Sequence, residues 1–447
     1  MATELKRCLP LSQVVIYGVG LILGAGVYVL IGTAAGLAGN MLWLSFLLAA
    51  LVAGFTAASY AELSCLFPQA AAEYLYIRTA FGSDALAWIV GVVAIVIGFS
   101  TASAVATGFA DYAAYFIPLD RTLCAALLIA VMSLVSYLGI RQSAALNTVA
   151  TGIEVGGLLL IIGAGGWAML RGGLQPADLS ALPQGSDGAS VLPVISAAAL
   201  IFFAYMGFED IANIAEETRD PQRTLPRAFL LALLISTVIY ILVAIVAVSV
   251  IPAAELAGTE QPLAAVMLVL IGGHTPTLMA LIALFATANT VLITLIVCAR
   301  MIYGIARSNA LPAVLARVHP RRQTPVAAIV LTGLASGCFL LLGGIHILAS
   351  VSDIGIFILF LMVNLSNILL RYKRPHCTRA WRTPLNIGRF PLLSLAGALS
   401  CVGMLFSIDH PVQIAGHTLS GLAVGLSVFA LTVPLYLIFG RRRPAPQ

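Results

Sequence analysis

Glu154 is the residue whose surroundings most demand a chemical explanation. It is the one ionisable side chain in the stretch VATGIEVGGLLLII (149–162), which otherwise has the composition of a lipid-spanning helix. A carboxyl group at membrane depth is costly, and such groups usually carry protons, bind ions or pair with another polar group. An acidic pair, Glu209 and Asp210, follows Gly207 within another apolar stretch. Both features raise the question of what acidic groups do within apolar segments.

The composition indicates a polytopic helical membrane protein. The chain has 447 residues, of which 61% are hydrophobic and 9% charged, whereas soluble domains are about 25% charged. Apolar runs recur along its whole length, and only helices or closed barrels satisfy the backbone in hydrocarbon. A barrel would show short alternating strands instead of these continuous runs. Because the seven cysteines form no CxxC pair, we expect no disulfide or metal site. No cofactor is expected either.

The hydropathy pattern predicts an all-α membrane protein with twelve spans and both termini in the cytoplasm. With that topology, every Lys and Arg among the 23 lies on the cytoplasmic side except Arg121 and Arg171, as the positive-inside rule requires. The basic residues behind the net charge of +5 therefore report topology, and no nucleic-acid partner is expected. The expected location is a plasma or inner membrane. The predicted spans are 12–36, 41–67, 84–116, 123–140, 144–170, 190–217, 228–252, 276–307, 325–343, 346–371, 391–407 and 418–440.

Two predicted spans carry glycines near their middles, at corresponding places in two halves of the chain. The first contains Gly24-Ala25-Gly26, and the sixth contains Gly207 just before its acidic pair. Five spans per half would give the halves opposite orientations, the inverted-repeat pattern in which Gly-interrupted helices mark a substrate site. Unwound turns free N–H groups for a carboxylate and carbonyls for an ammonium, which together suit an amino acid. The alternative is that the glycines only allow close helix packing.

Four stretches resemble the amino acid–polyamine–organocation (APC) transporter superfamily. They are GLILGAGVYVLIG (20–32), AELSCLFPQAAAEYLYIRTAFG (61–82), FFAYMGFEDIANIAEETRDPQRTLPRA (202–228) and ARMIYGIARSNALP (299–312). The resemblance implies a LeuT-like core with its first and sixth helices broken, followed by two accessory helices. Ala70-Ala71-Ala72 depart from the family's usual Ser-Gly-Gly. The implied units are a first inverted repeat at 8–170, a second at 190–371 and accessory helices at 391–440.

The resemblance also implies which residues bind substrate. In relatives, the substrate carboxylate meets backbone amides that correspond to Ala25 and Gly26, while carbonyls of both breaks meet the amine. Phe203 matches an aromatic lid, and Glu209 matches an acid that in some relatives recognises cationic substrates or gates the site. The expected substrate-binding set is Ile22, Gly24, Ala25, Gly26, Phe203, Ala204, Met206, Gly207 and Glu209.

Three interpretations of Glu154 remain open. The resemblance places it where many proton-coupled or sodium-independent members carry a lysine, so its charge is reversed. It could carry a proton together with substrate, or stay ionised and help ligate Na⁺ beside Asn289 and Thr290 of the eighth span, since hard cations prefer oxygen ligands. In the third interpretation it is a hydrogen-bonded structural group. Glu154, Asn289 and Thr290 are therefore the expected coupling residues.

We expect a secondary active transporter that imports small or medium neutral amino acids by alternating access, coupled to protons. A cationic amino acid or polyamine carrier, an exchanger and a Na⁺-coupled carrier are alternatives. A non-transporting sensor or a channel is a different class, and the chain lacks a selectivity-filter motif such as TVGYG. No catalytic residue is expected. The expected partners are the amino acid, a proton or Na⁺, and the lipid bilayer, for a monomer or homodimer.

Overall fold

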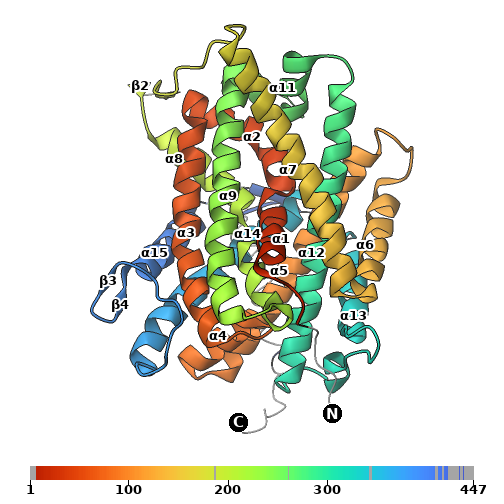
Figure 1. Cartoon of the computed structure of the whole chain (residues 1–447), viewed down its shortest axis with the longest axis vertical. Coiled ribbons are helices and arrows are strands. Elements are labelled where there is room, and N and C mark those ends of the chain that lie inside the picture. The colour runs from red at the N-terminus through yellow and green to blue at the C-terminus, as the bar shows by residue number, and fades with distance from the viewer. Residues whose placement is uncertain are drawn as a thin grey trace.

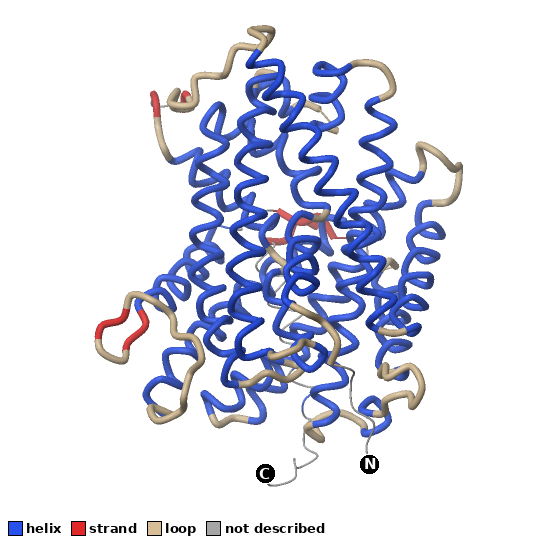
Figure 2. Tube along the Cα trace, in the orientation of Figure 1, coloured by secondary structure: helices blue, strands red, loops and turns tan. Residues whose placement is uncertain are grey.

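The chain folds into a bundle of helices that run mostly along one common direction (Figures 1 and 2). The computed structural model describes residues 7–185, 188–259, 261–341, 345–407, 411–414 and 417–420, together with Thr432 and Tyr436. The helices of the first half are α1 (Leu11–Leu23), α2 (Ala25–Ala38), η1 (Gly39–Met41), α3 (Leu42–Leu66), α4 (Ala72–Phe81), α5 (Asp84–Ala113), α6 (Arg121–Leu138) and α7 (Ile140–Leu170).

The second half continues the bundle with shorter 3₁₀-helical pieces near its start. Its helices are α8 (Leu192–Ile201), η2 (Phe202–Tyr205), η3 (Phe208–Glu217), α9 (Pro221–Val250), α10 (Ala253–Ala257), α11 (Pro262–Ile271), α12 (Thr275–Arg307), η4 (Ala313–Ala316), α13 (Val326–Phe339), α14 (Ile345–Lys373) and α15 (Leu392–Ser407). The strands are β1 (Gln184–Gly185), β2 (Gly188–Ala189), β3 (Asn386–Ile387), β4 (Phe390–Pro391), β5 (Pro411–Ile414) and β6 (His417–Ser420), paired as three antiparallel hairpins.

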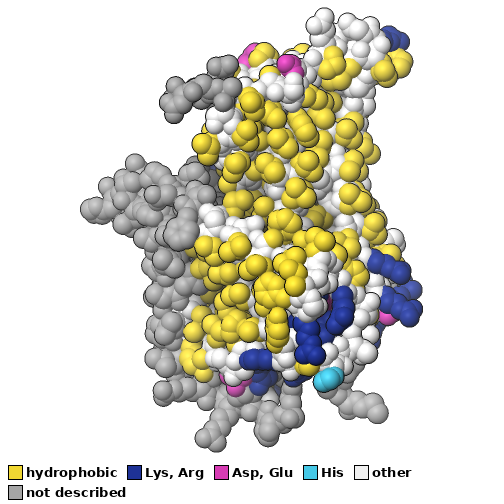
Figure 3. Space-filling view, turned by 90° about the vertical axis from the view of Figure 1, so that its left-hand side faces the viewer, with side chains coloured by type: hydrophobic (Ala, Val, Ile, Leu, Met, Phe, Trp, Pro, Cys, Tyr) yellow, Lys and Arg dark blue, Asp and Glu magenta, His cyan; other side chains and the backbone are white. Residues whose placement is uncertain are grey.

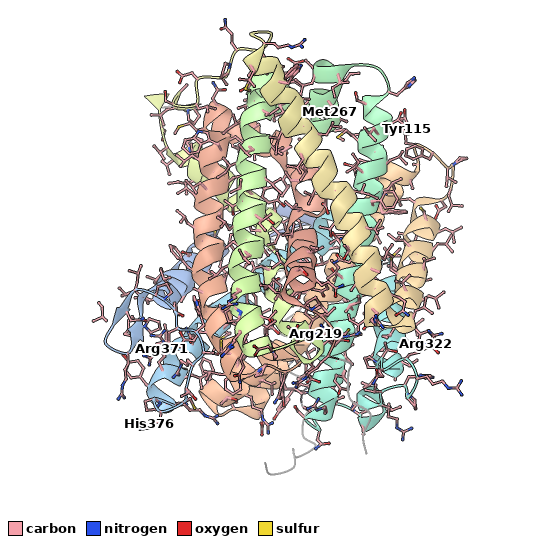
Figure 4. All side chains as sticks on the ribbon, in the orientation of Figure 1. Tyr115, Arg219, Met267, Arg322, Arg371 and His376 are labelled. Carbon is pink, nitrogen blue, oxygen red and sulfur yellow. The ribbon has the colours of Figure 1, made fainter. Side chains whose placement is uncertain are left out.

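The surface has the character expected of a protein that crosses a membrane. Nine helices within the described ranges are long and apolar enough to span, and three more apolar helices are shorter. One face of the molecule is covered by hydrophobic side chains, with Lys and Arg gathered toward one end (Figure 3). Arg219, Arg322 and Arg371 lie at that end, here called the basic end, while Tyr115 and Met267 lie at the opposite, distal end (Figure 4).

Most of the predicted spans correspond to observed helices, with boundary shifts of a few residues. α9 begins earlier than predicted, at Pro221, because proline is well suited to the first position of a helix. The prediction is wrong at the start of the last span. Residues 417–420 form strand β6, paired with β5 across two intervening residues, a spacing typical of a hairpin. The remainder of that predicted span, except Thr432 and Tyr436, lies outside the described residues.

α1 lies near the centre of the bundle, where α9, α7 and α12 pack around it (Figure 1). Its N-terminal end is tied to the end of η3, because the N–H groups of Cys8 and Leu9 both donate to the carbonyl of Glu217. The first interrupted helix is therefore held directly against the second. This arrangement places the two predicted breaks within reach of each other.

Candidate functional site

The first break is a single residue, Gly24, between α1 and α2. Its backbone angles, φ −32° and ψ −153°, are not helical, and no side chain caps the start of α2. A Cβ atom at Gly24 would lie 2.4 Å from Oγ1 of Thr290, so a larger residue would clash with α12. The N–H groups in the first turn of α2 have no intrahelical acceptor, and the helix dipole makes this end electropositive.

The second break replaces α-helix with two 3₁₀ segments joined by an extended turn. Met206 is extended, and Gly207 has φ +108°, a conformation that favours glycine. A Cβ at Gly207 would lie 3.1 Å from Cβ of Leu21, and one at Gly26 would lie 2.9 Å from Cα of Ala204. The two interruptions are therefore in direct contact, and glycine is what allows the close approach.

A cavity lies against both breaks and is also lined by residues of α5, α12 and α14. Its volume is about 90 Å³, several times the roughly 10–15 Å³ that one water needs. The apolar walls include Ile97, Val297 and Ile356. Eight predicted residues line it: Ile22, Gly26, Phe203, Ala204, Met206, Gly207, Glu209 and Thr290. Gly24, Glu154 and Asn289 are not among its described lining residues, and the side chain of the predicted residue Ala25 lies outside what the structure describes.

Three carboxyl groups line this cavity, namely Glu209, Asp210 and Glu73. Glu209 accepts a hydrogen bond from the N–H of Gly207 at 2.9 Å, so it is held at the second break. Neighbouring residues of an α-helix point about 100° apart, which would direct only one of Glu209 and Asp210 at the site. Instead both line the cavity, because the cavity extends past the break along η3 as far as α4.

Glu73 was not predicted from sequence to be a site residue. Its carboxylate accepts hydrogen bonds from the Tyr60 hydroxyl at 3.1 Å and from Nδ2 of Asn213 at 3.2 Å. Oδ1 of Asn213 in turn accepts from the N–H of Ala72 at 3.1 Å. Burial raises the pKa of the Glu73 carboxyl above its ordinary value. The only sequence signal was its position in the family-like stretch 61–82, where it lies in the first turn of α4.

Tyr240 of α9 is a second residue that the sequence did not reveal. Its hydroxyl lies within hydrogen-bond distance of the carbonyl of Ile22 and 3.0 Å from that of Ala204. These are carbonyls of the first and second broken helix, so one hydroxyl bridges the two breaks. The tyrosine is fully buried. Nothing in its local sequence distinguishes it from other aromatic residues in an apolar helix.

Glu154 lies on α7, behind the breaks. It is fully buried, and neither carboxyl oxygen has a hydrogen-bond partner among the described residues. The hydroxyls of Tyr28 and Tyr240 are close enough to interact with a charge on Glu154. Asn289 does not contact Glu154 by a hydrogen bond; its Nδ2 donates to Oγ1 of Thr151 at 3.1 Å. The predicted coupling residues are therefore neighbours in the bundle and do not form one cluster.

Comparison with known proteins decides the family. A family model described as amino acid permease matches residues 9–431. The chain belongs to this amino acid permease family. The permease is 28% identical to the branched-chain amino acid permease BcaP of Bacillus subtilis, with 96% of this chain and 93% of that protein covered. It is 27% identical to the methylthioribose transporter of the same species, with 96% and 94% covered.

A third relative is larger than this permease. The vacuolar cationic amino acid transporter 2 of Arabidopsis thaliana is 33% identical over 83% of this chain, which spans 61% of that protein's length. Membership of the family, together with the membrane-length helices, makes the protein a multi-pass amino acid transporter. The resemblance seen in the sequence motifs is thereby confirmed at the level of the family.

A buried ion pair connects the permease's second break with α12 near the basic end. Nε and Nη2 of Arg300 donate to the carboxylate of Glu217 at 3.2 and 2.8 Å. Both side chains are 1% exposed. Because Glu217 ends η3 and its carbonyl also receives the N-terminal segment, this pair holds three elements together on the basic-end side of the cavity.

Proposed function

We propose that this permease imports small or medium neutral amino acids by alternating access, with protons as the coupling ion. The observation that carries the proposal is the meeting of two interrupted helices at one cavity. A site at such a meeting can be exposed to either side as helices rock around it. The apolar walls suit an aliphatic side chain, and the backbone groups suit the zwitterionic part of the substrate.

The substrate's two charges have matching groups at the breaks. The uncapped start of α2, with Gly26 on the cavity wall, offers N–H groups and a positive dipole end to the carboxylate. The carbonyls of Ile22 and Ala204 are available to the ammonium, once Tyr240 yields one of them. Phe203 lines the same cavity and serves as the lid.

The proposed architecture is a LeuT-like pair of inverted repeats, at 8–170 and 190–371, followed by accessory helices from 391 to 440. In this proposal the basic end faces the cytoplasm of a plasma or inner membrane. Its support is the concentration of arginines at that end (Figures 3 and 4), because cytoplasmic loops are enriched in Lys and Arg.

Glu154 is the proposed proton carrier. A buried carboxylate without a donor would be strongly destabilised in the membrane interior, which favours the neutral, protonated acid in this conformation. Its release of the proton would then accompany a change in its exposure, as helices move against α7. Thr290 contributes by packing α12 against the first break at Gly24, and Asn289 by holding α12 against α7 through its hydrogen bond to Thr151.

The test is Glu154→Gln in proteoliposomes, with Glu255→Gln, at an exposed residue of α10, as the matched control. A thermal-shift screen of amino acids first identifies the substrate. The Glu154 variant should lose accumulation driven by a proton gradient yet keep counterflow exchange, whereas the control should keep both. Unchanged gradient-driven accumulation in Glu154→Gln contradicts proton coupling through this residue. Loss of uptake on replacing Na⁺ with choline would instead indicate sodium coupling.

A cationic amino acid is the second candidate substrate, and one observation favours it. Three carboxyl groups, Glu73, Glu209 and Asp210, line the cavity, and the chain resembles a protein named as a cationic amino acid transporter. Competition of lysine and arginine against labelled leucine separates the candidates. Stronger inhibition by the cationic amino acids, abolished by Asp210→Asn, would establish the second candidate.

A further inference from the structure

A stripe of buried polar side chains runs along one face of α7 from the basic end to Glu154. Its members are Ser143, Asn147, Thr151 and Glu154, each at most 3% exposed. Their spacing of four, four and three residues places them one above another on a helix. Eleven residues of helix correspond to about 16 Å, so the stripe reaches from near the basic end into the membrane interior.

The middle of the stripe is hydrogen-bonded and packed against α1 and α12. Oγ1 of Thr151 donates to Oδ1 of Asn147 at 3.2 Å and accepts from Nδ2 of Asn289 at 3.1 Å. A Cβ at Gly20 of α1 would lie only 2.1 Å from Oγ1 of Thr151. The backbone of α1 therefore closes over this hydroxyl, and the glycine is what leaves room for it.

A second, small cavity adjoins the lower part of the stripe. Its volume is about 10 Å³, close to the roughly 10–15 Å³ that one water needs. Gln13, Tyr17, Ser143 and Asn147 supply its polar lining. The Tyr17 hydroxyl is buried without a hydrogen-bond partner among the described residues, as expected where a water would bridge polar groups. Gln13 is only half-buried and lies in the first turn of α1.

The stripe is separate from the substrate cavity, because none of its four residues is among the lining residues of that cavity. The titratable groups that face Glu154 from neighbouring helices are the hydroxyls of Tyr28 on α2 and Tyr240 on α9. At the end of the stripe nearer the basic end, the charges of Glu217 and Arg300 are close enough to interact with the hydroxyl of Tyr17. The upper end of the stripe is thus apolar apart from tyrosines, while the lower end is polar.

We propose that this stripe is a proton route that links Glu154 to the basic end without passing through the substrate cavity. The inference rests on the proposed role of Glu154. When helix movement lets water enter along the stripe, the Glu154 carboxyl gives its proton to that water and is left as a carboxylate, while the Thr151 hydroxyl hydrogen-bonds the water. Asn147 and Asn289 orient the hydroxyl. A water molecule then carries the proton past Ser143 and Gln13 to bulk solvent.

The test measures substrate-driven proton movement in proteoliposomes that contain a pH-sensitive dye, alongside counterflow of labelled substrate. Thr151→Val keeps the shape of the side chain and removes its hydroxyl. It should slow proton movement by about tenfold, equivalent to about 1.4 kcal/mol in the barrier, while counterflow is unchanged. Thr151→Ser restores the hydroxyl and should restore the rate. Thr148→Val, on the same helix and bonded only locally to Ala144, is the matched control.

The outcomes separate this route from the proposed function. If Glu154→Gln abolishes proton-driven accumulation but Thr151→Val moves protons at the normal rate, the route is wrong while Glu154 remains the carrier. If Glu154→Gln has no effect, the coupling proposal fails and the route fails with it. Should Thr151→Val fold poorly, Asn147→Leu breaks the same chain. A normal proton rate in a folded Asn147→Leu protein also overturns the route.

Discussion

Replacing Tyr240 with phenylalanine should weaken the fold and tighten substrate binding at the same time. The hydroxyl has one proton and lies between two carbonyls, those of Ile22 and Ala204. Ile22 belongs to the last turn of α1, where carbonyls lack intrahelical donors. In the proposed site, the substrate ammonium uses these same carbonyls. Tyrosine and substrate therefore compete for the same acceptors.

The size of the effect follows from the hydrogen bonding. Loss of the hydroxyl leaves a buried carbonyl without its donor, which should lower the free energy of unfolding by about 1–3 kcal/mol. Binding no longer requires the release of a hydrogen bond worth about 1 kcal/mol. The dissociation constant should then fall about fivefold, since tenfold corresponds to about 1.4 kcal/mol.

The assay is equilibrium binding of the labelled substrate to purified protein, with thermal unfolding measured on the same samples. Tyr205→Phe is the matched control, because its hydroxyl also donates to a buried carbonyl, that of Phe46 at 3.1 Å. The control should lose stability without a change in affinity. Weaker binding in Tyr240→Phe would refute the competition and would mean that the hydroxyl accepts a hydrogen bond from the ammonium.

Three further outcomes test other contacts. Glu217→Gln leaves Arg300 buried without its partner and should cost about 3–5 kcal/mol of stability, measured by thermal unfolding; a loss below 1 kcal/mol would contradict this. Burial raises the pKa of Glu73 in the folded state above 4.5. Between 4.5 and that folded pKa, the folded state binds more protons than the unfolded state, so the free energy of unfolding should fall as pH rises through this range. Glu73→Gln should flatten that decline in unfolding scans at several pH values, and an unchanged slope would exclude Glu73 as its source. Ala71 has φ 57°, so Ala71→Gly should stabilise the protein by roughly 0.5–1 kcal/mol, and a lower melting temperature would show that packing of its Cβ outweighs strain.

Much of the helical framework could be predicted because its signals are local. Long apolar runs give the spans, and the glycines at positions 24 and 207 show where two helices break. α4 and α11 were missed because each is too short to be recognised as a membrane span from its hydropathy. The hairpin at 411–420 was missed because an apolar run of that length does not by itself distinguish strand from helix.

The sequence by itself determined that this protein is a helical membrane transporter with two broken helices and a lone carboxyl on α7. These properties depend on residue type and on spacing along a single segment. Only the tertiary structure decided that Tyr240 bridges the breaks, that Glu73 reaches the cavity and that Asn289 bonds to Thr151. Tyr240 and Ile22 are 218 residues apart in the chain. Contacts of that kind depend on the rotation and register of packed helices, because a turn of about 100° per residue changes which side chain faces a neighbour.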